Sequence, residues 1–301
     1  MKIFIVTLAL SLLSGSLSWA WGKRGHEIVE AVAARILEEK KGKTFLRPHE
    51  FDLGYYANVP DLIWRKTAAK AEPPQHYMDW TKDYAEVFGT PKSLPLEFKD
   101  FKAKLGDKFK LNWGVVPYRI HGLIKRCNSL ASNLDKDKQG PLLVCLGVLG
   151  HYTGDLSMPL HVAENHDGQL TGQKGVHVYF ESDLVDQLDP EIKVEVMNKA
   201  LKVYERSEML KLKGEEAVRW MISDSYGQIA ELLKTDKETS RQNLLKAANK
   251  FKPLIISRLV QGAILTAHVW SEILDQVKSF DEDHFVFFDG TPDYIEPGSE
   301  L

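Results

Sequence analysis

Apolar side chains recur every three or four residues along most of this chain, a spacing typical of helices with one buried face. Between residues 22 and 40, the apolar positions from Ile28 to Leu37 follow this period. The same period predicts further helices over residues 115–134, 190–212, 214–234 and 240–278. We find neither internal repeats nor low-complexity tracts. We therefore expect a single all-α domain.

Two stretches depart from the helical pattern. Prolines are frequent between residues 41 and 113, where we expect short helices joined by long loops. A loop rich in glycine, asparagine and glutamine is expected over residues 164–175. Between these stretches, Pro141 is placed as in the first turn of a helix. Residues 142–149 then present apolar groups on every side, so this helix should run through the centre of the fold.

The first twenty residues have the features of a secretory signal peptide. Lys2 provides a positive start, and residues 3–13 form an apolar run too short to span a bilayer. Ser18-Trp19-Ala20 is a small-x-small cleavage site. Cleavage between Ala20 and Trp21 would give a secreted or periplasmic protein with no transmembrane segment in the mature chain.

The mature chain would comprise a helical domain over residues 21–280 and an irregular tail over residues 281–301, where glycine and proline occur among acidic and aromatic residues. The full chain has 39 basic and 42 acidic residues, and loss of the single positive charge of Lys2 would change its formal charge from −3 to −4. A mildly acidic protein has no general attraction for nucleic acid or anionic membranes. Any binding of phosphate must therefore depend on a local group of residues. We also expect the protein to be a monomer.

The chain has two cysteines, Cys127 and Cys145. Outside the cytoplasm they would form one disulfide. Two buried thiols on neighbouring helices are an equally good interpretation, and the sequence leaves both open.

Five residues with metal-binding side chains lie between positions 151 and 181. His151 and Asp155 are four residues apart, as are His177 and Glu181, so each pair would share one face of a helix. His161 lies between the pairs, just after a proline. Neutral imidazole with carboxylate is a typical ligand set of hydrolytic zinc. A buried His–Asp pair without metal would explain the first two residues, but not the cluster.

Further candidate ligands lie upstream. His76 follows a Pro-Pro pair, and Asp61 precedes it by fifteen residues. Taken alone, Asp61 is better explained as a helix N-cap after Pro60. Signal cleavage would also expose the α-amine of Trp21, which binds metal when deprotonated. His26 follows five residues later, and a surface histidine beside a frayed end is the alternative.

These residues carry a family resemblance. The stretch 151–165, with His-Tyr, Gly-Asp, Pro-x-His and Ala-x-Asn in place, resembles the signature of bacterial zinc-dependent phospholipases C, as does Gly175-Val176-His177-x-x-x-Glu181. The start Trp21-Gly22-x-x-Gly25-His26 and the Asp61–His76 gap are more similar to the fungal and plant single-strand-specific zinc nucleases. The resemblance implies an all-α fold around a trinuclear zinc site.

The resemblance also implies a role for each candidate ligand. One zinc ion would be held by Asp61, His76, His151 and Asp155. A second would be held by the amine and carbonyl of Trp21, by His26, and by Asp155 as a bridge. The third would be held by His161, His177 and Glu181. Two closely spaced ions would activate water for hydrolysis, and the third would polarise the phosphate.

Other residues gain roles from the same resemblance. Asp61 would serve as general base. Arg65 would clamp phosphate through its guanidinium, although the comparable arginine of the nucleases lies one residue earlier. Tyr77 and Asp79 match nuclease residues that stack on a base and hydrogen-bond it, whereas core packing is the other explanation for Tyr77. The spacing supports no role for His166.

Two substrates are compatible with this chemistry. The specific central block favours phospholipid hydrolysis to diacylglycerol and a phosphorylated headgroup, which is our leading expectation. The N-terminal spacing favours the alternative, a nuclease that cuts single-stranded nucleic acid to 5′-mononucleotides. Lys23 and Arg24 place positive charge beside the first ligand and weaken any preference for choline. A secreted zinc-binding protein without activity is a third, less favoured hypothesis.

Overall fold

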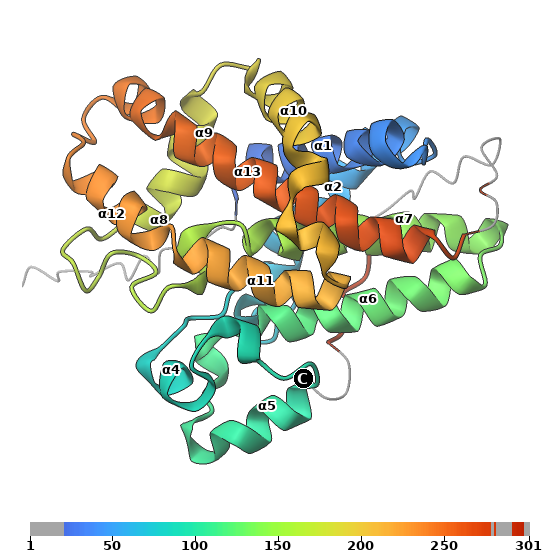
Figure 1. The fold of residues 1–301 in the computed structure, drawn as a ribbon, viewed down its shortest axis with the longest axis horizontal. Helices are drawn as coiled ribbons and strands as arrows, with labels where there is room; N and C mark the ends of the chain where they lie inside the picture. Colours follow the sequence, from blue (N-terminus) through green and yellow to red (C-terminus); the bar gives the residue numbers. More distant parts are fainter. Residues whose placement is uncertain (1–20, 278–279, 281–290, 298–301) are drawn as a thin grey trace, which may run out of the picture.

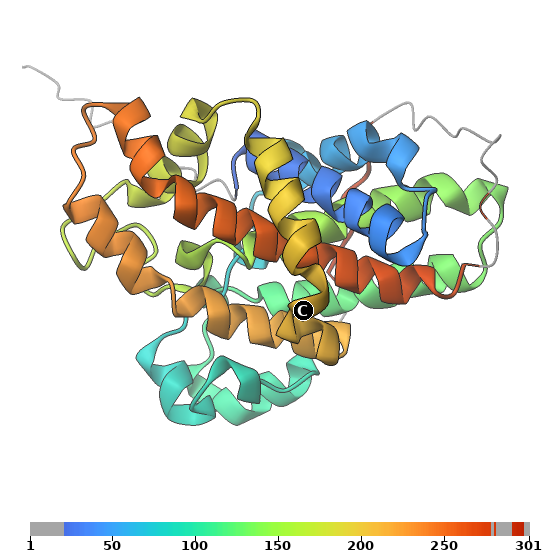
Figure 2. The same cartoon turned by 45° about the horizontal axis from the view of Figure 1, so that its top comes forward.

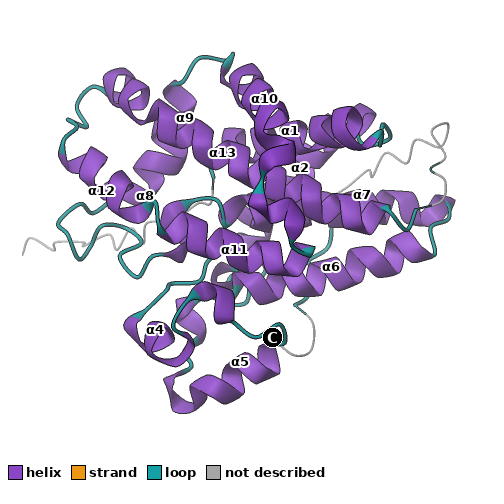
Figure 3. Cartoon of the chain, viewed as in Figure 1, coloured by secondary structure: helices purple, strands orange, loops and turns teal. Residues whose placement is uncertain are grey.

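The computed structural model describes residues 21–277, 280 and 291–297 of the chain. These residues form helices, turns and loops (Figure 3). Among them, Trp80 and Ala163 form an isolated parallel bridge. The all-α prediction is confirmed. The α-helices are α1 (Lys23–Lys41), α2 (Glu50–Val59), α3 (Arg65–Thr67), α4 (Lys82–Phe88), α5 (Phe98–Leu105), α6 (Val116–Ser132), α7 (Lys136–Asp155), α8 (Val176–Val178), α9 (Leu184–Gln187), α10 (Ile192–Val203), α11 (Gly214–Tyr226), α12 (Ile229–Lys237) and α13 (Leu244–Leu274).

Helix α7 lies at the centre of the bundle, as its all-round apolar surface predicts. It packs against α1, α2, α6 and α13 (Figure 1), and every residue from Leu142 to Asp155 is buried. The prediction that Pro141 opens this helix is wrong. The helix begins at Lys136 because the Asp135 side chain accepts a hydrogen bond from the Lys138 amide at 3.1 Å, and Pro141 lies inside it on the exposed side.

The remaining helices agree with the predicted pattern in type but not always in extent. The predicted helix over residues 214–234 is divided into α11 and α12 at Gly227, and α10 ends at Val203 instead of continuing to residue 212. The proline-rich region forms short helices, of which α4 and α5 project from one side of the bundle (Figures 1 and 2). Residues 164–175 form the expected loop.

One described helix, α13, is long and apolar enough to cross a membrane. However, 78% of its most apolar window is buried inside the structure, as in the core helix of a globular domain. The predicted signal peptide over residues 1–20 lies outside the described residues. Of the predicted tail, only residues 291–297 are described, and they form neither helix nor strand.

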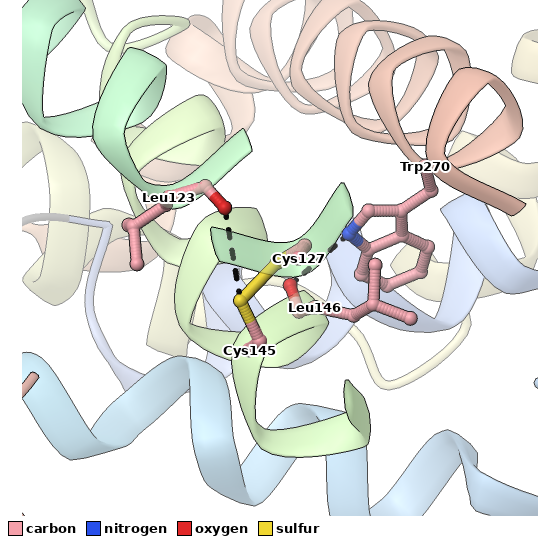
Figure 4. Close-up of a disulfide and its surroundings, with 5 residues drawn as sticks. All are labelled: Leu123, Cys127, Cys145, Leu146 and Trp270. Atoms are coloured by element: carbon pink, nitrogen blue, oxygen red, sulfur yellow. Dashed lines mark hydrogen bonds between the residues drawn. A yellow bond between two sulfur atoms is a disulfide. The ribbon is translucent and has the colours of Figure 1, made fainter. Parts of the chain in front are cut away.

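Cys127 of α6 and Cys145 of α7 form a disulfide (Figure 4), which decides between the two interpretations left open by the sequence. Both residues are fully buried. The bond ties the central helix to its neighbour, and Trp270 of α13 donates a hydrogen bond to the Leu146 carbonyl beside it at 3.0 Å.

Reduction of this disulfide should lower the free energy of unfolding by about 3 kcal/mol, because the bond closes a loop between residues 18 apart and restricts the unfolded chain. Denaturant unfolding of the oxidised and reduced protein measures the difference. A variant with Cys127→Ala and Cys145→Ala is the control, since the reductant should leave its midpoint unchanged. Equal midpoints for oxidised and reduced wild type would contradict the expectation.

Glu30 of α1 is fully buried against α7. Its Oε1 lies 1.7 Å from the position that a Cβ on Gly150 would occupy, so the glycine provides the space for the carboxyl group. Among the described residues, neither oxygen of Glu30 has a hydrogen-bond partner. Burial raises the pKa of Glu30 well above its usual value, because desolvation favours the protonated, neutral form of the carboxyl group.

The Glu30→Gln variant should gain stability relative to the wild type, measured as the free energy of unfolding, as the pH rises from about 5 to 8. The unfolded chain loses the Glu30 proton above about pH 4.3, whereas the folded chain holds it up to its own, raised pKa, so wild-type stability falls as the pH rises between the two pKa values. Glutamine does not titrate, and the variant's advantage should grow by up to about 1.4 kcal/mol per pH unit. Urea unfolding of both proteins across this range tests the expectation; a constant difference would count against it.

Candidate metal centre

The predicted ligands converge from distant parts of the chain onto the C-terminal half of α7. Two of the segments that carry them are π-helical: Pro60–Trp64 holds Asp61, and Tyr179–Asp183 holds Glu181. Such wide turns are rare and often mark functional sites, because they redirect one side chain without ending the helix. The predicted regular helix carrying His177 and Glu181 is therefore replaced by α8 and a π-helical turn.

Asp61, His76 and His151 form the first group, each with a ligand atom within 4.8 Å of the others. His76 Nδ1 lies 2.9 Å from His151 Nε2 and 3.6 Å from Asp61 Oδ1. Asp155 Oδ2 lies 3.1 Å from His76 Nδ1 and 3.3 Å from His151 Nε2. His151 Nδ1 donates to the Ala57 carbonyl at 2.6 Å, which leaves Nε2 unprotonated and facing the group.

His26, His151 and Asp155 form the second group. His26 Nε2 lies 3.4 Å from Asp155 Oδ1, so Asp155 presents one oxygen to each group. Trp21 is fully buried beside this group, and its Nε1 donates to Ser157 Oγ at 2.9 Å. The indole thereby fixes the residue whose backbone the resemblance assigns to the metal.

His161, His177 and Glu181 form the third group. Glu181 Oε2 lies 3.5 Å from His161 Nε2 and 3.1 Å from His177 Nε2. Both imidazoles donate from Nδ1 to a backbone carbonyl, His161 to His76 at 2.7 Å and His177 to His166 at 2.9 Å. Their Nε2 lone pairs are therefore directed toward the glutamate, and the His76 carbonyl connects this group to the first.

Several atoms in these groups are buried without a hydrogen-bond partner. Among the described residues they are His26 Nε2, Asp155 Oδ1, His161 Nε2, His177 Nε2 and both carboxylate oxygens of Glu181. Buried polar atoms are normally hydrogen-bonded, and a cation bound among these converging nitrogen and oxygen atoms would satisfy them. Imidazole nitrogen and carboxylate oxygen are the ligands that zinc takes, and the residues present fit zinc ions.

Burial also shifts the pKa of each type of ligand. For Asp61 and Asp155, burial is the largest cause of the shift and raises the pKa of each carboxyl group to about 6. Burial lowers the pKa of His177 to about 4. Zinc requires neutral imidazole and ionised carboxylate. The protein therefore supplies the neutral imidazoles, and a bound cation would favour the ionised carboxylates.

A family model described as S1/P1 Nuclease matches residues 21–275, which include all the candidate ligands. The chain belongs to the S1/P1 nuclease family. No curated protein matches it. As a family member, the protein is a zinc-dependent phosphodiester hydrolase. Zinc is the expected cofactor of the three groups, while the number of ions is not given by the match.

The family match reverses our order of preference between substrates. It supports the nuclease and gives no support to phospholipid hydrolysis. The block of candidate ligands that led to the phospholipase prediction concerns metal binding, which both enzymes share, and so does not distinguish their substrates. The N-terminal spacing, from Trp21 to His26 and from Asp61 to His76, indicated the S1/P1 family correctly.

The structure places Arg65 at the first group, as its predicted phosphate-binding role requires. Arg65 Nε lies 2.9 Å from Asp61 Oδ1, four residues earlier, and its side chain is 10% exposed. Arg24 differs from the expectation. Its guanidinium donates to the carbonyls of Val185 and Leu188 at 2.8 and 2.6 Å, so it caps the C-terminal end of α9.

Tyr77 and Asp79 lie at the edge of the centre, directly after His76. Tyr77 is half-buried and donates from its hydroxyl to the Asn112 carbonyl at 3.3 Å. Asp79 is buried, and its Oδ2 lies 3.6 Å from His166 Nδ1. Sequence reasoning gave His166 no role, yet its imidazole meets Asp79 and its carbonyl orients His177.

Sequence reasoning also missed Glu72. This residue is fully buried, and its Oε1 lies 3.1 Å from His76 Nε2, the nitrogen that faces away from the first group. A carboxylate four residues before a ligating histidine is a usable signal, since that spacing joins the two on a helical turn. The Pro-Pro pair between them obscured it.

Proposed function

We propose that this protein is a secreted, single-strand-specific nuclease that releases 5′-mononucleotides and uses three zinc ions. The placement of Tyr77 and Asp79 immediately after the ligand His76 carries the proposal. A half-buried aromatic ring offers a stacking surface, and a buried carboxylate accepts hydrogen bonds from the amino group of a base. A base reaches such a site only when it is unstacked, so the arrangement favours single strands.

The proposed ligands follow the three groups. Asp61, His76, His151 and Asp155 would hold the first ion. His26, Asp155 and the backbone of Trp21 would hold the second, which requires cleavage after Ala20 and hence secretion. His161, His177 and Glu181 would hold the third. Zinc at these positions would supply Lewis-acid stabilisation of the phosphate and activation of water near neutral pH.

The chain's own residues would position the substrate. Arg65 would bind two phosphate oxygens through its guanidinium, in an orientation set by Asp61. Asp61 would accept the proton of the attacking water as an ionised carboxylate. Tyr77 and Asp79 would hold the base next to the scissile bond. We propose that the enzyme acts as a monomer.

The test compares substrates with the mature, zinc-loaded protein. A single-stranded DNA oligonucleotide should be cut to 5′-mononucleotides, the matching duplex far more slowly, and phosphatidylcholine vesicles not at all. Tyr77→Ala should lower kcat/KM on single strands roughly ten-fold, because stacking contributes about 1–3 kcal/mol per base. The variant should keep its zinc. Release of diacylglycerol from the vesicles with intact DNA would overturn the proposal in favour of the phospholipase.

A further inference from the structure

A buried network of charged residues lies next to His76, on the side of its imidazole that faces away from the first group. Glu72 Oε1 accepts a hydrogen bond from the Tyr152 hydroxyl and lies 3.1 Å from His76 Nε2. Glu72 Oε2 lies 4.0 Å from the Arg119 guanidinium, which also donates to the Tyr152 hydroxyl at 3.4 Å. A carboxylate at the outer nitrogen of a ligating histidine fixes the tautomer and the orientation of the ring.

Arg119 needs compensation because it is only 1% exposed. Three aromatic rings surround its guanidinium carbon, with centroids at 5.1 Å for Tyr152, 6.0 Å for Trp64 and 5.6 Å for Tyr294. Such contacts stabilise a desolvated cation. Tyr152 and Trp64 come from the helical domain, whereas Tyr294 comes from the C-terminal segment 291–297.

The C-terminal segment is attached to the domain at this point. Trp64 Nε1 donates to the Pro292 carbonyl at 3.0 Å, and the rings of Trp64 and Tyr294 meet edge to face at 5.3 Å. Pro292 is buried. Beside these contacts lies an open pocket of about 640 Å³, lined by the segment and by residues 63–64 and 66–71. Truncation of the Tyr294 ring would extend this pocket toward Arg119 and admit water to the network.

We propose that Glu72 and Tyr294 are positioning residues for the zinc ligand His76, with Tyr294 acting through Arg119. The C-terminal segment thus forms part of the support of the first metal group, although it lies more than 130 residues beyond the last residue of that group. This inference rests on the proposed metal centre, because it concerns the ion that His76 would hold.

The test measures zinc affinity by competition with a chelator, using the zinc-loaded mature chain. Glu72→Gln should weaken the binding of one ion by about 10- to 100-fold and leave the other ions unchanged. Tyr294→Ala should weaken the same ion to a smaller extent. The matched control is Asp293→Ala, which alters the exposed neighbour and should retain wild-type affinity. Tyr294→Phe keeps the ring beside Arg119, so its zinc affinity should stay closer to that of the wild type than the affinity of Tyr294→Ala. The visible spectrum of the cobalt-substituted protein should change for one site only.

Three outcomes count against the proposal. Wild-type affinity for every ion in Glu72→Gln and Tyr294→Ala would overturn it and leave the metal centre intact. An equal loss at all ions would indicate a general loosening of the fold instead of positioning of His76. A wild-type protein that binds no zinc would overturn the proposed function itself, and the inference with it.

Discussion

The Asp155→Asn variant should bind about one zinc ion and lose at least roughly a thousand-fold in kcat/KM on single-stranded DNA. Asp155 presents one oxygen to His26 and the other to His76 and His151, so its loss affects two ions at once. Asparagine keeps the shape but not the charge that two cations require. Stabilisation by metal ions is worth several kcal/mol in the transition state, and about 4 kcal/mol corresponds to the stated factor.

Zinc analysis by mass spectrometry and a cleavage assay measure the two effects together. The third group contains His161, His177 and Glu181 but not Asp155, so its ion should remain. Asp137→Asn provides the matched control, since it makes the same change on an exposed position of the same helix. Full zinc content in Asp155→Asn would contradict the bridging role.

A protein that keeps one extra residue before Trp21 should bind one zinc ion fewer and lose most of its activity. The extra residue converts the Trp21 amine into a peptide nitrogen, which does not bind metal at neutral pH. It also needs space beside an indole that is fully buried and hydrogen-bonded to Ser157. Because only the second group would use the amine, the other ions should be retained.

A removable leader gives the cleanest control for this prediction. The same preparation is assayed before and after a protease exposes Trp21, so that sequence and folding history are matched. Zinc content and activity should both rise on cleavage. Equal values before and after cleavage would exclude the amine as a ligand.

The convergence of the candidate metal ligands was the most predictable part of the molecule, because the spacing of these residues reflects local geometry. One helical turn brings His151 and Asp155 together. Because residues 142–149 of the same helix are apolar, these two polar residues indicated a functional role. His76 and His161 lie close together because their two segments pair in the folded protein: the Met78 amide donates a hydrogen bond to the His161 carbonyl at 2.9 Å. Only the family resemblance indicated that pairing before the structure did.

Supporting residues were harder to predict because they depend on contacts between distant segments. Nothing local marks Tyr294 as a neighbour of Arg119, or Gly150 as the space for Glu30. The error at Pro141 has a different cause: the Asp135 cap begins the helix earlier, and one proline on the exposed side is tolerated. The family match supports the alternative substrate over the leading one, because the central block predicts metal chemistry that both families share and does not predict specificity.

The central claim is that three zinc ions occupy the buried groups around α7. A crystal structure of the mature protein, with anomalous diffraction measured on both sides of the zinc absorption edge, tests it most directly. We predict three zinc peaks: one among Asp61, His76 and His151, one between His26 and Asp155, and one among the third group, His161, His177 and Glu181. An absence of zinc peaks at these positions in active protein would contradict the account.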